Sequence, residues 1–106
     1  MRRAVVVRSY RRLGRLMPRS ERGLRARSVR LAAGAAMPWH STGAREELLL
    51  VLEGRVRLDV RASGGRVRPR TIREGSCAFL PVGTPHHVVN PSRRAARYVY
   101  VTGMGR

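Results

Sequence analysis

The hydrophobic positions of this chain fall in short runs rich in valine and leucine, separated by glycine, proline and serine. Short runs with frequent turn residues are typical of β-strands, and few segments repeat apolar residues at helical spacing. Several short strands divided in this way indicate an all-β fold, a small antiparallel double-sheet barrel of the jelly-roll type. We expect strands at residues 4–8, 24–32, 46–53, 55–61, 66–72, 76–80, 86–90 and 96–102.

The predicted strand 55–61 alternates most clearly, with valine and leucine on one face and arginine and aspartate on the other. A four-residue loop at 62–65 would lead into the next strand and would place Asp59 opposite Arg68. The same register would set two pairs of arginines opposite each other, which is mildly destabilising. Pro69 lacks a backbone donor, so we expect this second strand to be an edge strand or to contain a bulge.

The segment 48–52 reads Leu-Leu-Leu-Val-Leu and is apolar on both faces of its strand. Strands of this kind are covered on both sides. One face should meet the domain core, and the other needs a second sheet, the N-terminal segment or another subunit. A homodimer and coverage within one chain are both consistent with this pattern. The net charge of +17 would oppose association at low salt.

A chain of 106 residues fits one domain, so residues 1–106 are interpreted as a single domain with its core at 24–103. Residues 9–23 are rich in arginine and are expected to be a loop, a mobile segment or a helical turn. No apolar run approaches the ~18 residues that a membrane span requires. The single cysteine, Cys77, excludes an internal disulfide and is expected to be a small buried hydrophobe. A cytoplasmic location is expected.

All 23 basic residues are arginine, and the chain has no lysine. A strongly basic protein can bind nucleic acid or another acidic surface. However, the replacement of every lysine by arginine is typical of a coding bias, and no aromatic residues are interleaved with the arginines to stack on bases. We therefore do not expect the chain to bind nucleic acid specifically, and any such binding would be weak and insensitive to base sequence.

Three histidines and six acidic residues are few enough to inspect individually. His40 follows Pro38 and Trp39, Glu47 opens the apolar strand, and His86 and His87 follow a proline-rich turn. Two imidazoles and one carboxylate are a workable ligand set for Fe, Mn, Ni, Co or Zn. On residue type alone this signal is weak, because histidines near strand ends are often surface or capping residues.

The spacing of these residues carries more information than their types. Residues 34–54 read Gly34-x5-His40-x-Thr42-x4-Glu47-x6-Gly54, and residues 75–90 read Gly75-x5-Pro81-x-Gly83-x2-His86-x3-Asn90. These segments resemble the two signature motifs of the cupin superfamily, G-x5-H-x-H-x3,4-E-x6-G and G-x5-P-x-G-x2-H-x3-N. Every fixed position matches except Thr42, which stands where the family has its second histidine.

The resemblance implies that His40, Glu47 and His86 bind one divalent metal ion, Fe, Mn, Ni, Zn or Co, inside the sandwich. Thr42 would point to the same side as His40, whereas His87 would point away. Two histidines and one carboxylate leave open positions on an ion for a substrate. Without the second histidine, two further interpretations stay open: a pocket that binds an organic ligand without metal, and a degenerate site that binds nothing.

The implied function is that of a small metal-binding cupin, either an enzyme acting on a small polar molecule or a non-catalytic module that binds or senses a sugar, acid or anion. The fold does not choose between these. Among the aromatic residues, Tyr98 and Tyr100 share one face of the last strand and could line the pocket or donate a proton. Phe79 is expected to belong to the core.

Overall fold

The computed structural model describes residues 5–18 and 23–105. This part of the chain contains strands and loops but no helix, and therefore none long and apolar enough to cross a membrane. Seven of the predicted strands are present with bounds shifted by at most two residues. The strands are β1 (Gly14–Arg15), β2 (Leu24–Leu31), β3 (Ala36–Ser41), β4 (Arg45–Glu53), β5 (Arg55–Arg61), β6 (Val67–Arg73), β7 (Cys77–Leu80), β8 (Pro85–Val89) and β9 (Ala96–Met104).

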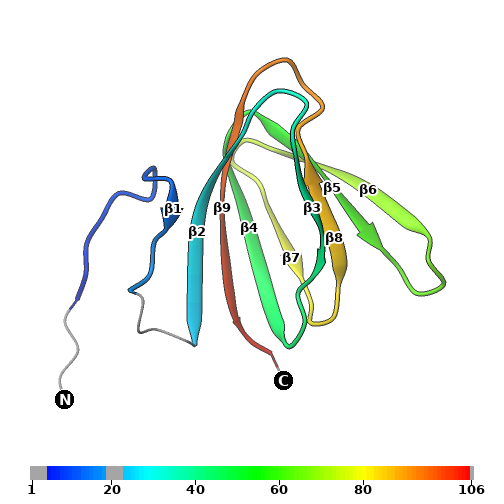
Figure 1. Cartoon of the computed structure of the whole chain (residues 1–106), viewed down its shortest axis with the longest axis horizontal. Helices are drawn as coiled ribbons and strands as arrows, with labels where there is room; N and C mark the ends of the chain where they lie inside the picture. Colours follow the sequence, from blue (N-terminus) through cyan, green and yellow to red (C-terminus); the bar gives the residue numbers. More distant parts are fainter. Residues whose placement is uncertain (1–4, 19–22, 106) are drawn as a thin grey trace.

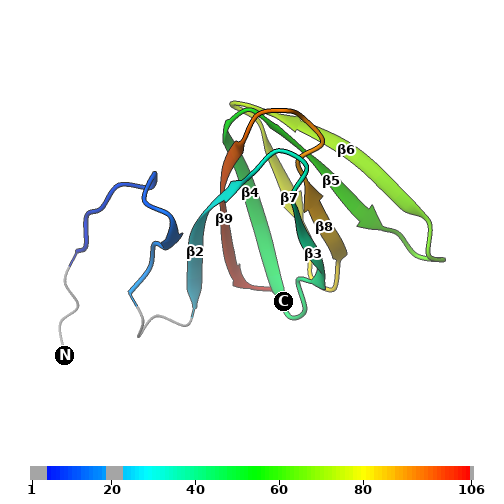
Figure 2. The same ribbon diagram turned by 45° about the horizontal axis from the view of Figure 1, so that its top comes forward.

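The strands form two antiparallel sheets (Figure 1). The first has the order β1-β2-β9-β4-β7 and the second the order β3-β8-β5-β6. The two sheets face each other, lie close at one end and diverge toward the other, where the β5–β6 hairpin projects (Figures 1 and 2). The predicted all-β double-sheet fold of jelly-roll type is therefore confirmed, although the sheets do not close into a continuous barrel.

The core fills the space between the sheets. Alternate residues of β4 and β9 point inward from the first sheet, and alternate residues of β5 and β8 point inward from the second. These positions are apolar because an alternating strand buries one face only. The innermost side chains are Leu49, Val51, Val56, Leu58, Leu80, Val88 and Tyr98.

Asn90 closes the end of the sandwich where the sheets lie close. Its side chain is fully buried. Its amide donates hydrogen bonds to the carbonyls of Leu31 (3.0 Å) and Arg94 (2.7 Å), and its oxygen accepts from the backbone N–H of Ser92 (3.1 Å). One side chain thus ties the loop after β2 to the loop before β9.

The predicted strand at 4–8 is wrong for residues 5–8, and residue 4 lies outside the described residues. Val5 and Val7 are 91% and 90% exposed. A run of valines favours extended backbone, but a strand also needs a partner for its hydrogen bonds and a surface against which to bury its side chains. No such partner lies beside this segment in the described part of the chain.

The segment 9–23, expected to be a loop, a mobile segment or a helical turn, contributes one short strand. Gly14 and Arg15 of β1 pair with Ser28 and Arg27 of β2. The rest of the described part, residues 9–13 and 16–18, consists of turns and bends without a helical turn. Residues 19–22 lie outside the described residues. The pairing attaches the N-terminal segment to the edge of the five-stranded sheet.

Strand β3 was not among the strands predicted from hydrophobic pattern, because its sequence contains Pro38. It is an edge strand of the four-stranded sheet. Its pairing with β8 is irregular between Met37 and His40, where Pro38 lies. An edge position and an irregularity are the two places where a strand tolerates a missing backbone donor.

The register predicted for the β5–β6 hairpin is wrong by one residue. Asp59 lies opposite Pro69, not Arg68, and Arg57 lies opposite Thr71. The turn has three residues, 63–65, instead of four, since the backbone N–H of Ala62 donates to the carbonyl of Arg66 (2.8 Å) and these two residues continue the pairing of the strands. The shift removes both predicted arginine pairs. The prediction from Pro69 that this strand lies at an edge is confirmed, since β6 is an outer strand of its sheet.

The outer face of β4 and β7 is apolar and open to solvent. Leu48 pairs with Phe79, and their side chains are 39% and 61% exposed. Phe79 was expected in the core and Cys77 was expected to be buried, but both are exposed. The short strand β7 turns these two side chains outward, because Leu80 takes the inward position next to Phe79. Within the described residues, the second face of segment 48–52 is therefore only partly covered.

Candidate metal centre

Three strands bring the predicted ligands together. His40 of β3 lies opposite His86 of β8 in one sheet, and Glu47 enters from β4 in the other. Potential ligand atoms of these three residues all lie within 4.8 Å of one another. The two imidazole rings are 4.3 Å apart between centroids and tilted by 58°. The convergence follows from the alternation of β4, where Glu47 shares its face with the buried Leu49 and Val51.

The three side chains differ in exposure. Glu47 is 7% exposed and His86 is fully buried, whereas His40 is exposed at the rim. A bound ion would therefore be enclosed on the side of Glu47 and His86 and reachable on the side of His40.

The backbone sets the orientation of both imidazoles. The Nδ1 atom of His40 lies 2.7 Å from the carbonyl oxygen of Pro38, and that of His86 lies 2.9 Å from the carbonyl oxygen of Thr84. Since a carbonyl only accepts, Nδ1 is the donor in each contact, and in the neutral form of the ring the lone pair then lies on Nε2. Hydrogen bonds of this kind hold histidine ligands in place in metal sites.

The Nε2 atom of His86 is buried and has no hydrogen-bond partner among the described residues. It lies 3.8 Å from Oε2 of Glu47, too far for a hydrogen bond. A buried polar atom without a partner costs free energy and calls for an explanation. A cation between this nitrogen and the Glu47 carboxylate would satisfy both atoms, so the residues fit a metal ion.

The ionisation of these groups reflects their burial. Burial raises the pKa of Glu47, although the nearby His40 lowers it in part. Burial lowers the pKa of His86 despite its hydrogen bond to Thr84, and the neighbouring histidines lower it further. Both shifts favour the uncharged forms. A neutral His86 is the form that binds metal, and a cation would restore the charged form of Glu47.

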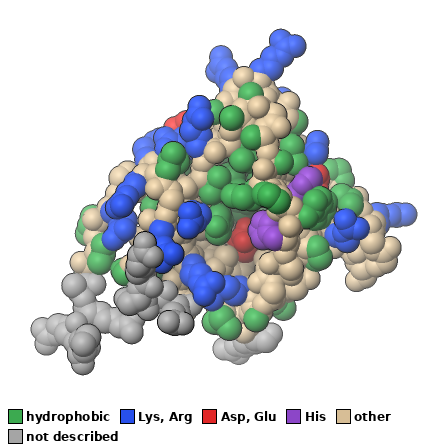
Figure 3. Space-filling model, viewed as in Figure 1, with side chains coloured by type: hydrophobic (Ala, Val, Ile, Leu, Met, Phe, Trp, Pro, Cys, Tyr) green, Lys and Arg blue, Asp and Glu red, His purple; other side chains and the backbone are tan. Residues whose placement is uncertain are grey.

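A small cavity of about 50 Å³ surrounds the three side chains. Besides His40, Glu47 and His86, its walls are Met37, Val88, Tyr98 and Tyr100. Burial strongly raises the pKa of Tyr98, so its hydroxyl stays protonated and is available as a donor. A larger cleft of about 520 Å³ adjoins the cavity and shares His40, Glu47 and Tyr100 with it. In the space-filling view, a histidine and an acidic side chain lie together in a hollow on this face (Figure 3).

Thr42 does not join this group. It lies just beyond the end of β3, and its hydroxyl forms hydrogen bonds outside the cluster. The hydroxyl donates to the carbonyl of Pro81 (2.8 Å) and accepts from the backbone N–H of Thr84 (2.9 Å). Where the family has its second histidine, this chain has a side chain that ties β3 to the turn before β8. Gly83 in that turn has a φ of 65°, as expected for its glycine.

His87 points to the other side of β8, as predicted. It lies 2.6 Å from Asp59 and stacks on Trp39, with ring centroids 4.3 Å apart and planes 17° apart. His86 and His87 therefore lie on opposite faces of β8, one in the cluster and the other beside Asp59 and Trp39. The exposed Glu46 is also separate from the cluster.

Sequence reasoning missed two parts of the site. Met37 was not singled out, and no pattern marked it, since β3 itself was not predicted from hydrophobicity. The arginines of β2 that line the larger cleft were also missed. Their signal was visible: Arg25 and Arg27 alternate in step with Val29, so they share its inward face.

Comparisons with known proteins agree with this fold. The sequence model of the cupin domain matches residues 27–102, so the chain belongs to the cupin family. No curated protein sequence matches the chain. Similar solved structures include an oxalate oxidase in complex with the substrate analogue glycolate, with 24% identity and a TM-score of 0.72 over 77% of this chain. The cupin domain of Schizosaccharomyces pombe Cnp3 has 19% identity and a TM-score of 0.74 over 86%.

An oxalate decarboxylase variant from B. subtilis is also similar, with 24% identity and a TM-score of 0.70 over 78% of this chain. The match covers 42% of the oxalate oxidase, 62% of the Cnp3 domain and 22% of the decarboxylase. Identities this low show a shared fold.

Proposed function

We propose that this cupin binds one divalent first-row metal ion through His40, Glu47 and His86 and uses it to bind, and in the enzymatic case to transform, a small polar molecule. The observation that carries the proposal is the buried, partnerless Nε2 of His86 beside the Glu47 carboxylate. Two imidazoles and one carboxylate suit Fe, Mn, Ni, Zn or Co.

A bound ion would supply Lewis acidity to a substrate atom placed in the cavity. The chain's own residues would do the rest. Pro38 and Thr84 hold the two imidazoles through their carbonyls. Tyr98 keeps its proton and can donate a hydrogen bond to an oxygen of the bound molecule. Met37 and Val88 form the apolar part of the cavity wall.

Metal content is the direct test. We expect purified, tag-free protein grown with Fe, Mn, Ni or Zn to contain about one ion per chain, and His40→Ala and His86→Ala to lose it because two protein ligands remain. His40 is exposed, so His40→Ala should fold normally. His87→Ala is the matched control, since it removes the adjacent imidazole outside the cluster. A wild-type protein without metal, or equal loss in the His87→Ala control, would contradict the proposal.

The rival function, a non-catalytic binding or sensor cupin, shares the same cavity. Turnover separates the two, because an enzyme converts the molecule that it binds and a sensor releases it unchanged.

We also propose that two copies associate through the exposed apolar face of β4 and β7, which contains Leu48 and Phe79. Exposed apolar surface of this kind on a folded domain marks interaction sites.

A further inference from the structure

The inner face of β2 changes character along its length. Leu31 and Val29 point into the core and are buried, at 6% and 9% exposure. The next residues on the same face are Arg27 and Arg25, because alternate residues of a strand share a face. An apolar strand face thus continues into two arginines at the end where the sheets diverge.

These arginines line the cleft of about 520 Å³ beside the candidate metal centre. Strand register fixes their place: Arg25 pairs with Thr102 of β9, and Thr102 pairs on its other side with Glu47. Neighbouring strands lie ~4.8 Å apart, so the backbones of Arg25 and Glu47 are separated by about 10 Å. Arg27 lies one step deeper, opposite Tyr100. One small molecule can therefore contact Arg25 and Arg27 and also reach Glu47 at the candidate metal centre.

The N-terminal segment adds a third cation. Arg15 of β1 pairs with Arg27 across the sheet edge and lines the same cleft, beside Met17 and Pro18. Arg45 is the fourth, but its guanidinium is engaged by Thr102 and by the carbonyl of Gly23. Burial lowers the pKa of Arg45, and the positive charge of the nearby Arg25 lowers it further.

Acidic partners for these cations are scarce. Glu47 is the one carboxylate among the described residues that line the cleft, and it is buried at the metal centre. Arg15, Arg25 and Arg27 form no ion pair with any residue in ranges 5–18 and 23–105. Three guanidinium groups around one concavity with so little negative charge form a site for an oxyanion.

We infer that the cleft binds a small anionic molecule, whose carboxylate or phosphate oxygens contact Arg25 and Arg27 while another of its groups reaches His40, Glu47 and His86. Arg15 closes the cleft from the N-terminal side. The volume suits a small ligand, since such sites span ~300–1,000 Å³. The placement of the second end rests on the proposed metal centre, but the arginine subsite does not.

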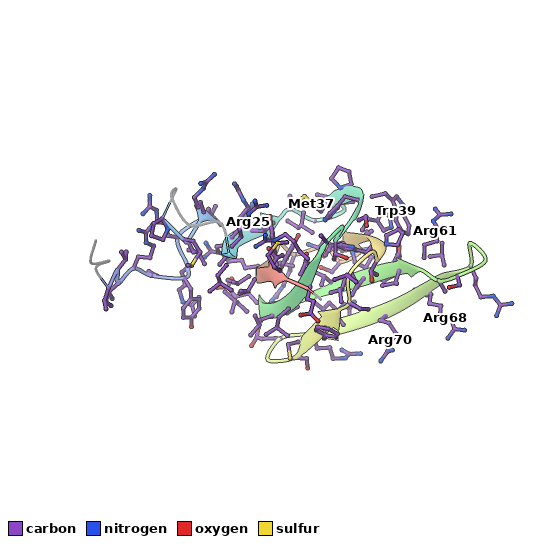
Figure 4. All side chains as sticks on the ribbon, turned by 90° about the horizontal axis from the view of Figure 1, so that it is seen from below. Arg25, Met37, Trp39, Arg61, Arg68 and Arg70 are labelled. Atoms are coloured by element: carbon purple, nitrogen blue, oxygen red, sulfur yellow. The ribbon has the colours of Figure 1, made fainter. Side chains whose placement is uncertain are left out.

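The experiment measures binding of citrate and of inorganic phosphate by isothermal titration calorimetry. Protein stripped with phenanthroline, an uncharged chelator, is compared with protein reloaded with metal. Arg25→Gln/Arg27→Gln removes two cations from the cleft. Arg68→Gln/Arg70→Gln is the matched control, because it removes the same charge from exposed positions of β6. Figure 4 shows Arg25 toward the N-terminal segment and Arg68 and Arg70 along the distant hairpin.

We expect at least one probe to bind, and the cleft variant to weaken it roughly tenfold or more, as loss of hydrogen bonds to a charged group does. The control variant should change affinity less than about twofold, because its distant charges are screened beyond ~8–10 Å. Binding of citrate alone would identify a carboxylate ligand, and binding of phosphate alone a phosphorylated one.

The inference is overturned if neither probe binds metal-loaded protein, or if both double variants weaken binding equally. Failure of the metal centre gives a different result. In that case the wild type would hold no metal, while its anion affinity would still depend on Arg25 and Arg27. Metal content should be unchanged in the cleft variant, which separates the two sites in the same samples.

Discussion

Replacement of His86 by leucine tests whether this residue is a metal ligand or an ordinary core histidine. In the metal-free protein the change removes the hydrogen bond from Nδ1 to Thr84, worth about 0.5–1.5 kcal/mol. It also removes the buried, partnerless Nε2, whose burial costs about 1–3 kcal/mol. The Thr84 carbonyl keeps a second donor, the backbone N–H of Thr42 at 3.2 Å. Metal-free His86→Leu should therefore be as stable as the wild type or slightly more stable.

Metal reverses this order. An ion that binds only the folded wild type stabilises it by about 2.7 kcal/mol at a free concentration of one hundred times Kd. For a domain of this size, each kcal/mol raises Tm by roughly 4–8 °C. His86→Leu lacks the buried ligand and should gain almost nothing. The two proteins should thus exchange their order of stability when metal is added.

The assay is urea unfolding, followed by circular dichroism, with and without Co²⁺, Mn²⁺ or Zn²⁺. His87→Leu is the control. It loses the 2.6 Å contact with Asp59 and the stacking on Trp39, so it should be less stable in both conditions while keeping the increment from metal. The reasoning is refuted if metal-free His86→Leu loses more than about 3 kcal/mol, or if metal stabilises it as much as the wild type.

Three further predictions follow from contacts elsewhere in the sandwich. Burial raises the pKa of Asp59, but hydrogen bonds from Arg57 and His87 outweigh this and leave it below 3.8. The stability that the charged Asp59 contributes is therefore complete above that pH and is lost as the pH falls through the folded-state pKa. Asp59→Asn should weaken the decrease of the free energy of unfolding at acid pH, measured by urea unfolding at a series of pH values. An unchanged decrease would count against this. Asn90→Ala should lower the free energy of unfolding by roughly 2–3 kcal/mol, because buried carbonyls lose their donor, and denaturation that shows less than half of this would contradict the role assigned to the side chain. Phe79→Glu should leave only monomer in light scattering, whereas the wild type should form more dimer as salt screens its charge; a wild-type protein that is monomeric at low and high salt would exclude the interface.

The sequence predicted the sheets better than their edges. Strand β5 was predicted with its observed bounds because its alternation is regular, and in the structure it pairs with β6 on one side and β8 on the other. The valines at residues 5–7 have the same strand propensity as the valines of β5, but in the described structure they are exposed and unpaired. Hydrophobic pattern reports what a strand would bury and does not report whether a partner exists.

The candidate ligands were predicted from the spacing of motifs, and the structure brings His40, Glu47 and His86 together. The fate of Thr42 could not be predicted in the same way. Its hydroxyl contacts Pro81 and Thr84, which lie far along the chain, and spacing within one motif holds no information about them. The inward direction of Arg25 and Arg27 could have been predicted from their alternation with Val29. Their place beside Glu47 could not, because it depends on the pairing of β2, β9 and β4.

The prolines of the four-stranded sheet have a consequence for the behaviour of many copies. Both outer strands of that sheet, β3 and β6, contain a proline, Pro38 and Pro69 respectively. Each proline removes one backbone donor from an edge that could otherwise template another chain. Arginines beside Pro69 add charge repulsion to the same edge. Fibril growth by strand addition is therefore obstructed at both edges of this sheet.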